Sequence, residues 1–332
     1  MKKLTKKTLM AVFAFVLAVV ALGTTTFAWF TLGQTVKVDG FDVNVQGGEG
    51  LEMAYISHDG DTNRSGWVSY ISGDDMLGYL STEYSAPTNF TTDFQFKAVT
   101  STDGKIFKPF VYDGSAAPSL GVDIAATTQK TLDDGILEFK LKFRTQASGT
   151  AQLTWNSVTL AEARDAGDLG WEAGVAYTHN KANAGESGNG SIAAGESLNY
   201  YTDAGARISV TSGDTTKVFE KPDGDYNTVL GNGTTTPAAL AFNKGAHNYF
   251  ENATGHDNLP TLFSSITNTV ETVTSINGTQ FAVDFPAAGS PGDYRELVVT
   301  VRVYLEGFDP DTFNCILSGK LKIALGFKLV TP

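Results

Sequence analysis

The chain has 332 residues, 42% of them hydrophobic, and a formal net charge of −12. The acidic balance disfavours nucleic acid and anionic membranes as partners. Cys315 is the only cysteine, so an internal disulfide is excluded as well, and a chain of this length must be stabilised by a large hydrophobic core.

The first 28 residues have the pattern of a secretory signal peptide. Lysines at positions 2, 3, 6 and 7 precede an uncharged apolar run over 9–22, and small residues follow. This run is shorter than the roughly 20 residues that a membrane span needs. We therefore predict a secreted, extracellular or cell-surface protein that is processed after Ala28, with Gly23 as the second choice. The alternative is an uncleaved segment, which would be the chain's only contact with a membrane.

The segment that follows the signal peptide is apolar and suited to a β-strand. Its large apolar residues are Trp29, Phe30, Leu32, Val36 and Val38. Once freed by cleavage, such a segment can add to the sheet edge of a second copy, and we predict that these five residues mediate assembly. The alternative is that the segment forms the first strand of its own sheet.

Alternating apolar residues predict a series of strands in the first half of the chain. Short strands are expected at 43–45, at 51–55 and around Phe94 and Phe96, with one helical turn over 76–81. A long strand is predicted at 137–143, with residues 138, 140, 142 and 144 on its polar face, and another begins at Leu153. The sequence LAEARDAGD, residues 160–168, favours two turns of helix.

The second half begins with a change in composition. Residues 180–260 are rich in Gly, Asn, Thr, Ala and Ser, and we predict a loop-rich insertion with strands only near 207–211 and 217–220. The chain then returns with two alternating segments, 297–305 and 321–329, predicted to be antiparallel neighbours. These patterns predict an all-β fold, a two-sheet jelly-roll-like sandwich formed by 29–179 and 261–332.

One turn carries oxygen ligands at alternate positions. Asp59, Asp61 and Asn63 supply carboxylate and amide oxygens, which are the ligands that calcium prefers, and we take them as candidate calcium ligands. The turn is not an EF-hand, because Arg64 and Tyr70 occupy the positions that require Gly and Glu. The alternative is that Asp, Gly and Asn simply form a turn.

No arrangement of residues in the sequence predicts catalysis. The four histidines form no zinc-protease helix motif, and there is no G-x-S-x-G sequence. Aromatic residues such as Trp67 and Tyr70 can stack on sugars, although ordinary packing is the alternative. We expect a non-enzymatic protein with no cofactor other than calcium.

The start of the chain resembles the TasA/camelysin family of exported proteins. The resemblance rests on the lysine-rich signal ending in Thr26-Phe27-Ala28-Trp29-Phe30-Thr31, and on the strand Gly40-Phe41-Asp42-Val43-Asn44-Val45. It covers about the first 45 residues and implies a jelly-roll sandwich and a role as a matrix-fibre subunit. The camelysin branch is metalloprotease-like, but the acidic residues that often follow the processing site in that family are replaced here by Thr31-Leu32-Gly33-Gln34.

These observations predict a cell-surface or extracellular-matrix structural protein. The expected role is that of a self-assembling fibre subunit, as in a biofilm, with other copies of itself or other surface proteins as partners. Two alternatives remain open, a surface adhesin or carbohydrate-binding module and a metal-dependent secreted hydrolase.

Overall fold

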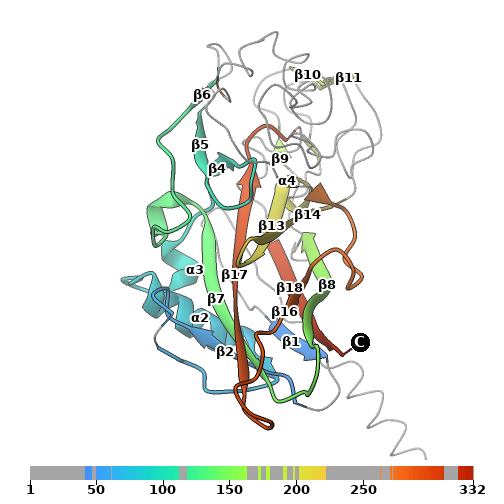
Figure 1. The fold of residues 1–332 in the computed structure, drawn as a ribbon. Coiled ribbons are helices and arrows are strands. Elements are labelled where there is room, and N and C mark those ends of the chain that lie inside the picture. Colours follow the sequence, from blue (N-terminus) through green and yellow to red (C-terminus); the bar gives the residue numbers. More distant parts are fainter. Residues whose placement is uncertain are drawn as a thin grey trace, which may run out of the picture.

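The computed structural model describes residues 42–46, 50–60, 62–111, 118–162, 171–172, 177–179, 190–192, 197–198, 202–221, 262, 270, 272–309 and 321–331. Strands dominate this part of the chain, and they form two main sheets that pack face to face (Figure 1). The all-β prediction is therefore confirmed. The jelly-roll connectivity stays a prediction.

The smaller sheet has five strands among the described residues. In spatial order they are β16 (Ala282–Asp284), β8 (Gln152–Glu162), β18 (Leu321–Val330), β1 (Asp42–Gln46) and β3 (Tyr70–Ile71). The long strands β8 and β18 are antiparallel, whereas β1 runs parallel to β18. Both margins of this sheet end in very short strands, β16 of three residues and β3 of two.

The larger sheet has nine described strands, with β17 (Arg295–Glu306) at its centre. On one side of β17 lie β13 (Ala206–Ser212), β14 (Thr215–Glu220) and β15 (Thr272–Val273). On the other side β17 pairs with β7 (Leu137–Thr145), and β7 pairs with β2 (Glu52–Ile56). The end of β17 also pairs with β4 (Ala98–Thr100), which is followed in the sheet by β5 (Lys108–Val111) and β6 (Ser119–Leu120).

Helices and minor strand pairs complete the described structure. The helical elements are α2 (Gly73–Glu83), α3 (Phe90–Asp93), η1 (Leu132–Asp134) and α4 (Thr202–Gly205). The two minor pairs are β9 (Trp171–Glu172) with β12 (Ser197–Leu198), and β10 (Tyr177–His179) with β11 (Gly190–Ile192). Ser72 caps the start of α2 by accepting a hydrogen bond from the backbone N–H of Asp75 at 3.3 Å.

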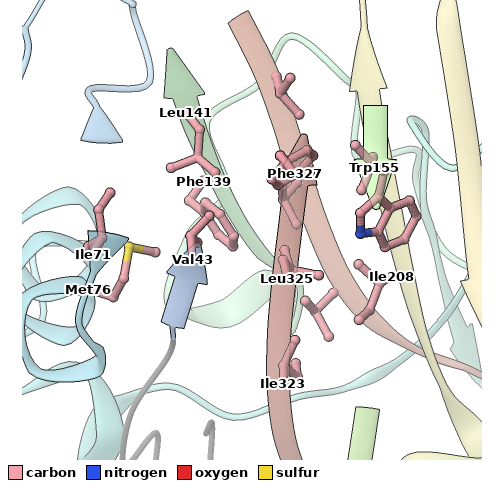
Figure 2. Packing of buried hydrophobic residues seen from close by; sticks show 14 of the residues in the cluster. Val43, Ile71, Met76, Phe139, Leu141, Trp155, Ile208, Ile323, Leu325 and Phe327 are labelled. Atoms are coloured by element: carbon pink, nitrogen blue, oxygen red, sulfur yellow. The ribbon is translucent and has the colours of Figure 1, made fainter. Parts of the chain in front are cut away.

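One continuous hydrophobic core lies between the two sheets. Rings from opposite sheets meet directly, since the centroids of Phe143 on β7 and Phe327 on β18 are 4.9 Å apart. Trp155 on β8 and Phe219 on β14 form a second such pair at 6.4 Å. Figure 2 shows side chains from both sheets and from α2 in this layer, among them Val43, Ile71, Met76, Leu141, Trp155, Ile208 and Leu325.

The predicted antiparallel pairing of 297–305 with 321–329 is wrong. Both segments are strands, and their predicted inward residues are buried, apart from Leu297, which is partly buried. However, β17 lies in the nine-stranded sheet and β18 in the five-stranded sheet. Alternation fixes which face of a strand is buried, but the two inner faces of a sandwich are equally apolar, so it cannot distinguish a hairpin from a crossover between sheets.

A bulge explains why the apolar pattern of β8 changes phase. Gly326 of β18 pairs with Ser157, but the next residue, Phe327, pairs with Trp155, so Asn156 is an extra residue on β8. A bulge of this kind shifts the alternation by one position. This is why Leu153 and Trp155 face the core before the bulge and Leu160 faces it afterwards.

Three further local predictions differ from the structure. The helix predicted at 160–168 is wrong where the chain is described, because β8 continues to Glu162. Phe94 and Phe96 are not in a strand but follow α3, where their rings pack edge to face at 5.1 Å. The strands β13 and β14 lie in the stretch predicted to be an insertion, yet they belong to the nine-stranded sheet.

Candidate functional site

The predicted calcium turn is a tight connection after β2. Asp61 lies outside the described residues. The side-chain oxygens of its two partners take protein hydrogen bonds, since Asp59 accepts from the Ser57 hydroxyl and Asn63 accepts from the Gly66 N–H at 2.8 Å. Within the described ranges, no group of three or more His, Cys, Asp or Glu side chains is placed to hold a metal ion. Calcium binding at this turn stays a prediction.

The five predicted assembly residues, Trp29, Phe30, Leu32, Val36 and Val38, all lie outside the described residues. The first described strand is β1, which pairs with β18 on one side over five residues. On its other side β1 is covered by β3 at Val43 and Asn44 only. β1, the first strand that the structure describes, therefore lies next to the short strand β3 at one margin of the smaller sheet.

The opposite margin of that sheet offers a longer stretch of backbone. The strand β16 pairs with β8 only at Gln152, Leu153 and Thr154, and the N–H of Trp155 donates to the carbonyl of Phe281 at 3.2 Å. No described strand pairs with residues 157–162 on that side of β8. Unpaired strand backbone of this kind is the structural element that accepts an added strand.

The outer face of the larger sheet buries a carboxylate among cations. We call Glu138, Arg302, Lys130 and His58 the Glu138 cluster. The carboxylate Oε2 of Glu138 lies 2.5 Å from Arg302 Nε and 3.8 Å from Lys130 Nζ, and its Oε1 lies 3.3 Å from His58 Nδ1. A cavity of about 10 Å³ beside it has room for about one water molecule.

The electrostatics of this cluster favour an ionised carboxylate. Burial raises the pKa of Glu138, but the hydrogen bond from His58 and the charges of Arg302 and Lys130 outweigh burial, so the pKa lies below its usual 4.5. Burial lowers the pKa of Lys130. The sequence placed residue 138 on the polar face of its strand, but the segment carrying Lys130 covers it. Mutual pairing of these charges points to a structural role.

A second buried group of charges lies where β14 and β17 end and β13 begins. We call Arg207, Glu220, Asp309 and Glu306 the Arg207 cluster. Arg207 Nε is 2.6 Å from Glu220 Oε2, and its Nη2 forms an ion pair with Asp309. Burial raises the pKa of Glu306 to about 7, although the Thr100 hydroxyl and Arg207 act in the opposite direction.

A third arrangement is partly exposed to solvent, on the outer face of the larger sheet at its opposite end. The guanidinium carbon of Arg144 lies 4.2 Å from the ring centroid of Trp67 and 4.1 Å from that of Tyr294. Arg144 Nε also pairs with Glu52 Oε2 at 2.6 Å. We call these four residues the aromatic–arginine patch. Sequence analysis singled out Trp67 but missed Tyr294 and Arg144. The three residues are far apart along the chain, since Arg144 follows Trp67 by 77 positions and Tyr294 follows Arg144 by 150.

Comparison of the chain with models of known protein families, with curated proteins and with solved structures found no match. Among the described residues, no helix is both long enough and apolar enough to cross a membrane.

Proposed function

We propose that the chain is an exported structural protein of the cell surface or extracellular matrix, related to the TasA/camelysin proteins and assembling by strand addition. In this proposal residues 29–38 of one copy pair with the edge of β8 in the next. The observation that carries the proposal is the stretch 157–162 of β8, which no described strand covers on its outer side.

The dimensions of the donor and acceptor are compatible. An extended strand rises about 3.3 Å per residue, so the donor of ten residues spans roughly 33 Å, more than the six acceptor residues need. Main-chain hydrogen bonds supply affinity, and alternating side chains such as Trp29 and Val36 select the register.

Deletion of residues 29–35 tests the donor. We expect a secreted, folded monomer with an unchanged circular dichroism spectrum that forms no filaments under electron microscopy. Because its β8 edge is intact, the truncated protein should also cap growing filaments and slow the assembly of the full-length mature protein when added below equimolar amounts. N-terminal sequencing of the full-length secreted protein should begin at Trp29.

Two outcomes of the deletion distinguish the alternatives. Unfolding of the truncated protein would show that residues 29–35 form a strand of their own sheet. Filaments made by the truncated protein would place the contact elsewhere. As an acceptor control, Thr159→Lys adds a charge beside the β8 edge and should weaken assembly, while Thr300→Lys, on the larger sheet, should leave it unchanged.

A further inference from the structure

We propose that the aromatic–arginine patch is a binding site for a neutral carbohydrate polymer. The inference is independent of self-assembly, because the patch lies on the larger sheet and the proposed donor and acceptor belong to the smaller one. Three properties of the patch favour a neutral carbohydrate: its ring surface, its spare hydrogen-bonding groups and its charge.

The register of three strands builds the patch. Glu52 on β2, Arg144 on β7 and Glu296 on β17 are direct neighbours in one row across the sheet. Tyr294 and Trp67 stand beside this row, and each contacts the guanidinium of Arg144. Because β-strands present alternate residues on one face, the three side chains of the row lie on the outer face, opposite the core residue Phe143. Trp67 and Tyr294 join them there through their contacts with Arg144.

The aromatic surface suits the apolar face of a sugar. Tyr294 is 46% exposed, although it is a large aromatic residue held in contact with Arg144. Its contact with the guanidinium orients the ring, so little further order is lost when a ligand stacks on it. Pyranose rings present a face of C–H groups that packs on aromatic rings, and exposed aromatic residues with a polar end commonly mark binding surfaces.

The polar groups of the patch match hydroxyl groups. Among the described residues, Arg144 uses Nε for Glu52, and no protein atom hydrogen-bonds its Nη1 or Nη2. These nitrogens can donate to sugar oxygens in the fixed geometry of the guanidinium. The second carboxylate oxygen of Glu52 can accept from a sugar hydroxyl. A vicinal pair of hydroxyls, which both donate and accept, satisfies both residues.

The charges of the patch favour a neutral ligand over an anionic one. Arg144 is paired with Glu52, and Lys142 Nζ lies 3.3 Å from Glu296 Oε2, so two cations are matched by two carboxylates. The chain as a whole carries −12, which repels polyanions at long range. An exposed site on a sheet face also suits an extended polymer better than a small molecule, which needs a concave pocket.

Affinity electrophoresis of the mature protein tests this inference. The gels contain barley β-glucan, galactomannan or glycol chitin as neutral polymers, or polygalacturonate as an anionic one. We expect at least one neutral polymer to retard the protein and polygalacturonate to have no effect. Tyr294→Ala and Arg144→Lys should each raise the dissociation constant about tenfold, the loss typical of a central contact residue. Val111→Ala, which shortens a 57% exposed apolar side chain on β5, near the opposite end of the larger sheet, is the control and should leave binding unchanged.

Each other outcome would overturn the proposal. Retardation by none of the polymers would exclude carbohydrate binding, and retardation by polygalacturonate alone would exclude a neutral ligand. Equal retardation of Tyr294→Ala and the unaltered protein would place the site elsewhere. Because Tyr294 is exposed, its replacement should preserve the fold, which thermal unfolding of the variant will check. Tyr294→Ala then decides the question even if Arg144→Lys is destabilised.

Discussion

Arg207 is buried and lies close to three carboxylates. Glu220 and Asp309 pair with it directly, and Glu306 lies close enough to feel its charge. Burial disfavours the ionised form of a carboxylate, and a second carboxylate nearby adds repulsion, so one member of the group is held partly protonated near neutrality. Glu306 has this property, since burial raises its pKa from 4.5 to about 7.

The raised pKa of Glu306 makes the free energy of unfolding depend on pH. Its contribution is fully present below about pH 4.5, where the unfolded chain is also protonated, and is lost as the pH rises through about 7. Glu306→Gln should remove this dependence. Between pH 5.5 and 8.5, the unaltered protein should lose about 2 kcal/mol more than the variant in urea unfolding.

Glu296→Gln is the control for this measurement, because Glu296 lies on the same strand but is exposed. It should keep the pH dependence of the unaltered protein. Identical pH profiles for the unaltered protein and Glu306→Gln would mean that Glu306 is ionised without cost in the folded state. The raised pKa would then be excluded.

At the level of strands and helices, alternation controls which side chains are buried. Val299, Val301 and Val303 of β17 are completely buried, and they pack against the smaller sheet. Thr300 lies on the opposite face, between Lys140 of β7 and Thr211 of β13. Adjacent residues of one strand therefore experience very different environments.

Aspartate at these two positions should change stability by very different amounts. Val301→Asp places a charge without a partner in the core and should destabilise the protein by more than about 4 kcal/mol, or prevent folding. Thr300→Asp introduces the same group next to Lys140 and should change stability by less than about 1 kcal/mol. Chemical unfolding of both variants measures the difference, and equal losses would contradict the assignment of the two faces.

The same alternation shows how much of the fold could be predicted from sequence. It located β1, β2, β7, β17 and β18 and their buried residues correctly. It did not show that β17 and β18 lie in different sheets, because strand partners are set by the path of the connections. Phe94 and Phe96 were predicted to lie in a strand because they are apolar and two positions apart. The same spacing of buried residues also occurs in the irregular segment that follows the short helix α3.

The candidate sites were less predictable than the fold, because they depend on register between distant strands. Arg144 was expected on a polar face, and this is correct. Its meeting with Trp67 and Tyr294 follows only once β2, β7 and β17 are aligned. Glu138 illustrates the opposite error: its alternate position predicted exposure, but a segment that crosses the outer face of the sheet buries it. Long connections cannot be placed by periodicity.

At the scale of the whole molecule, charge opposes the proposed assembly. Removal of residues 1–28 takes away four of the 24 basic residues and none of the 36 acidic ones, which changes the net charge from −12 to −16. Repulsion between such copies is screened by salt, with a Debye length of about 10 Å at 0.1 M and about 3 Å at 1 M. Filament growth should therefore be slow in dilute buffer and faster in 0.5 M sodium chloride, as measured by light scattering and electron microscopy.

Filament growth in calcium can distinguish general screening by salt from the effect of a specifically bound ion. If Asp59, Asp61 and Asn63 bind calcium, a few millimolar of it should accelerate growth beyond sodium chloride or magnesium chloride at equal ionic strength, because a bound ion also neutralises the acidic turn. The double variant Asp59→Asn, Asp61→Asn should lose this increment and keep its response to sodium chloride. An equal effect of all three salts would make the calcium site wrong and leave screening as the explanation. Absence of filaments in every salt, with the protein folded, would contradict self-assembly itself.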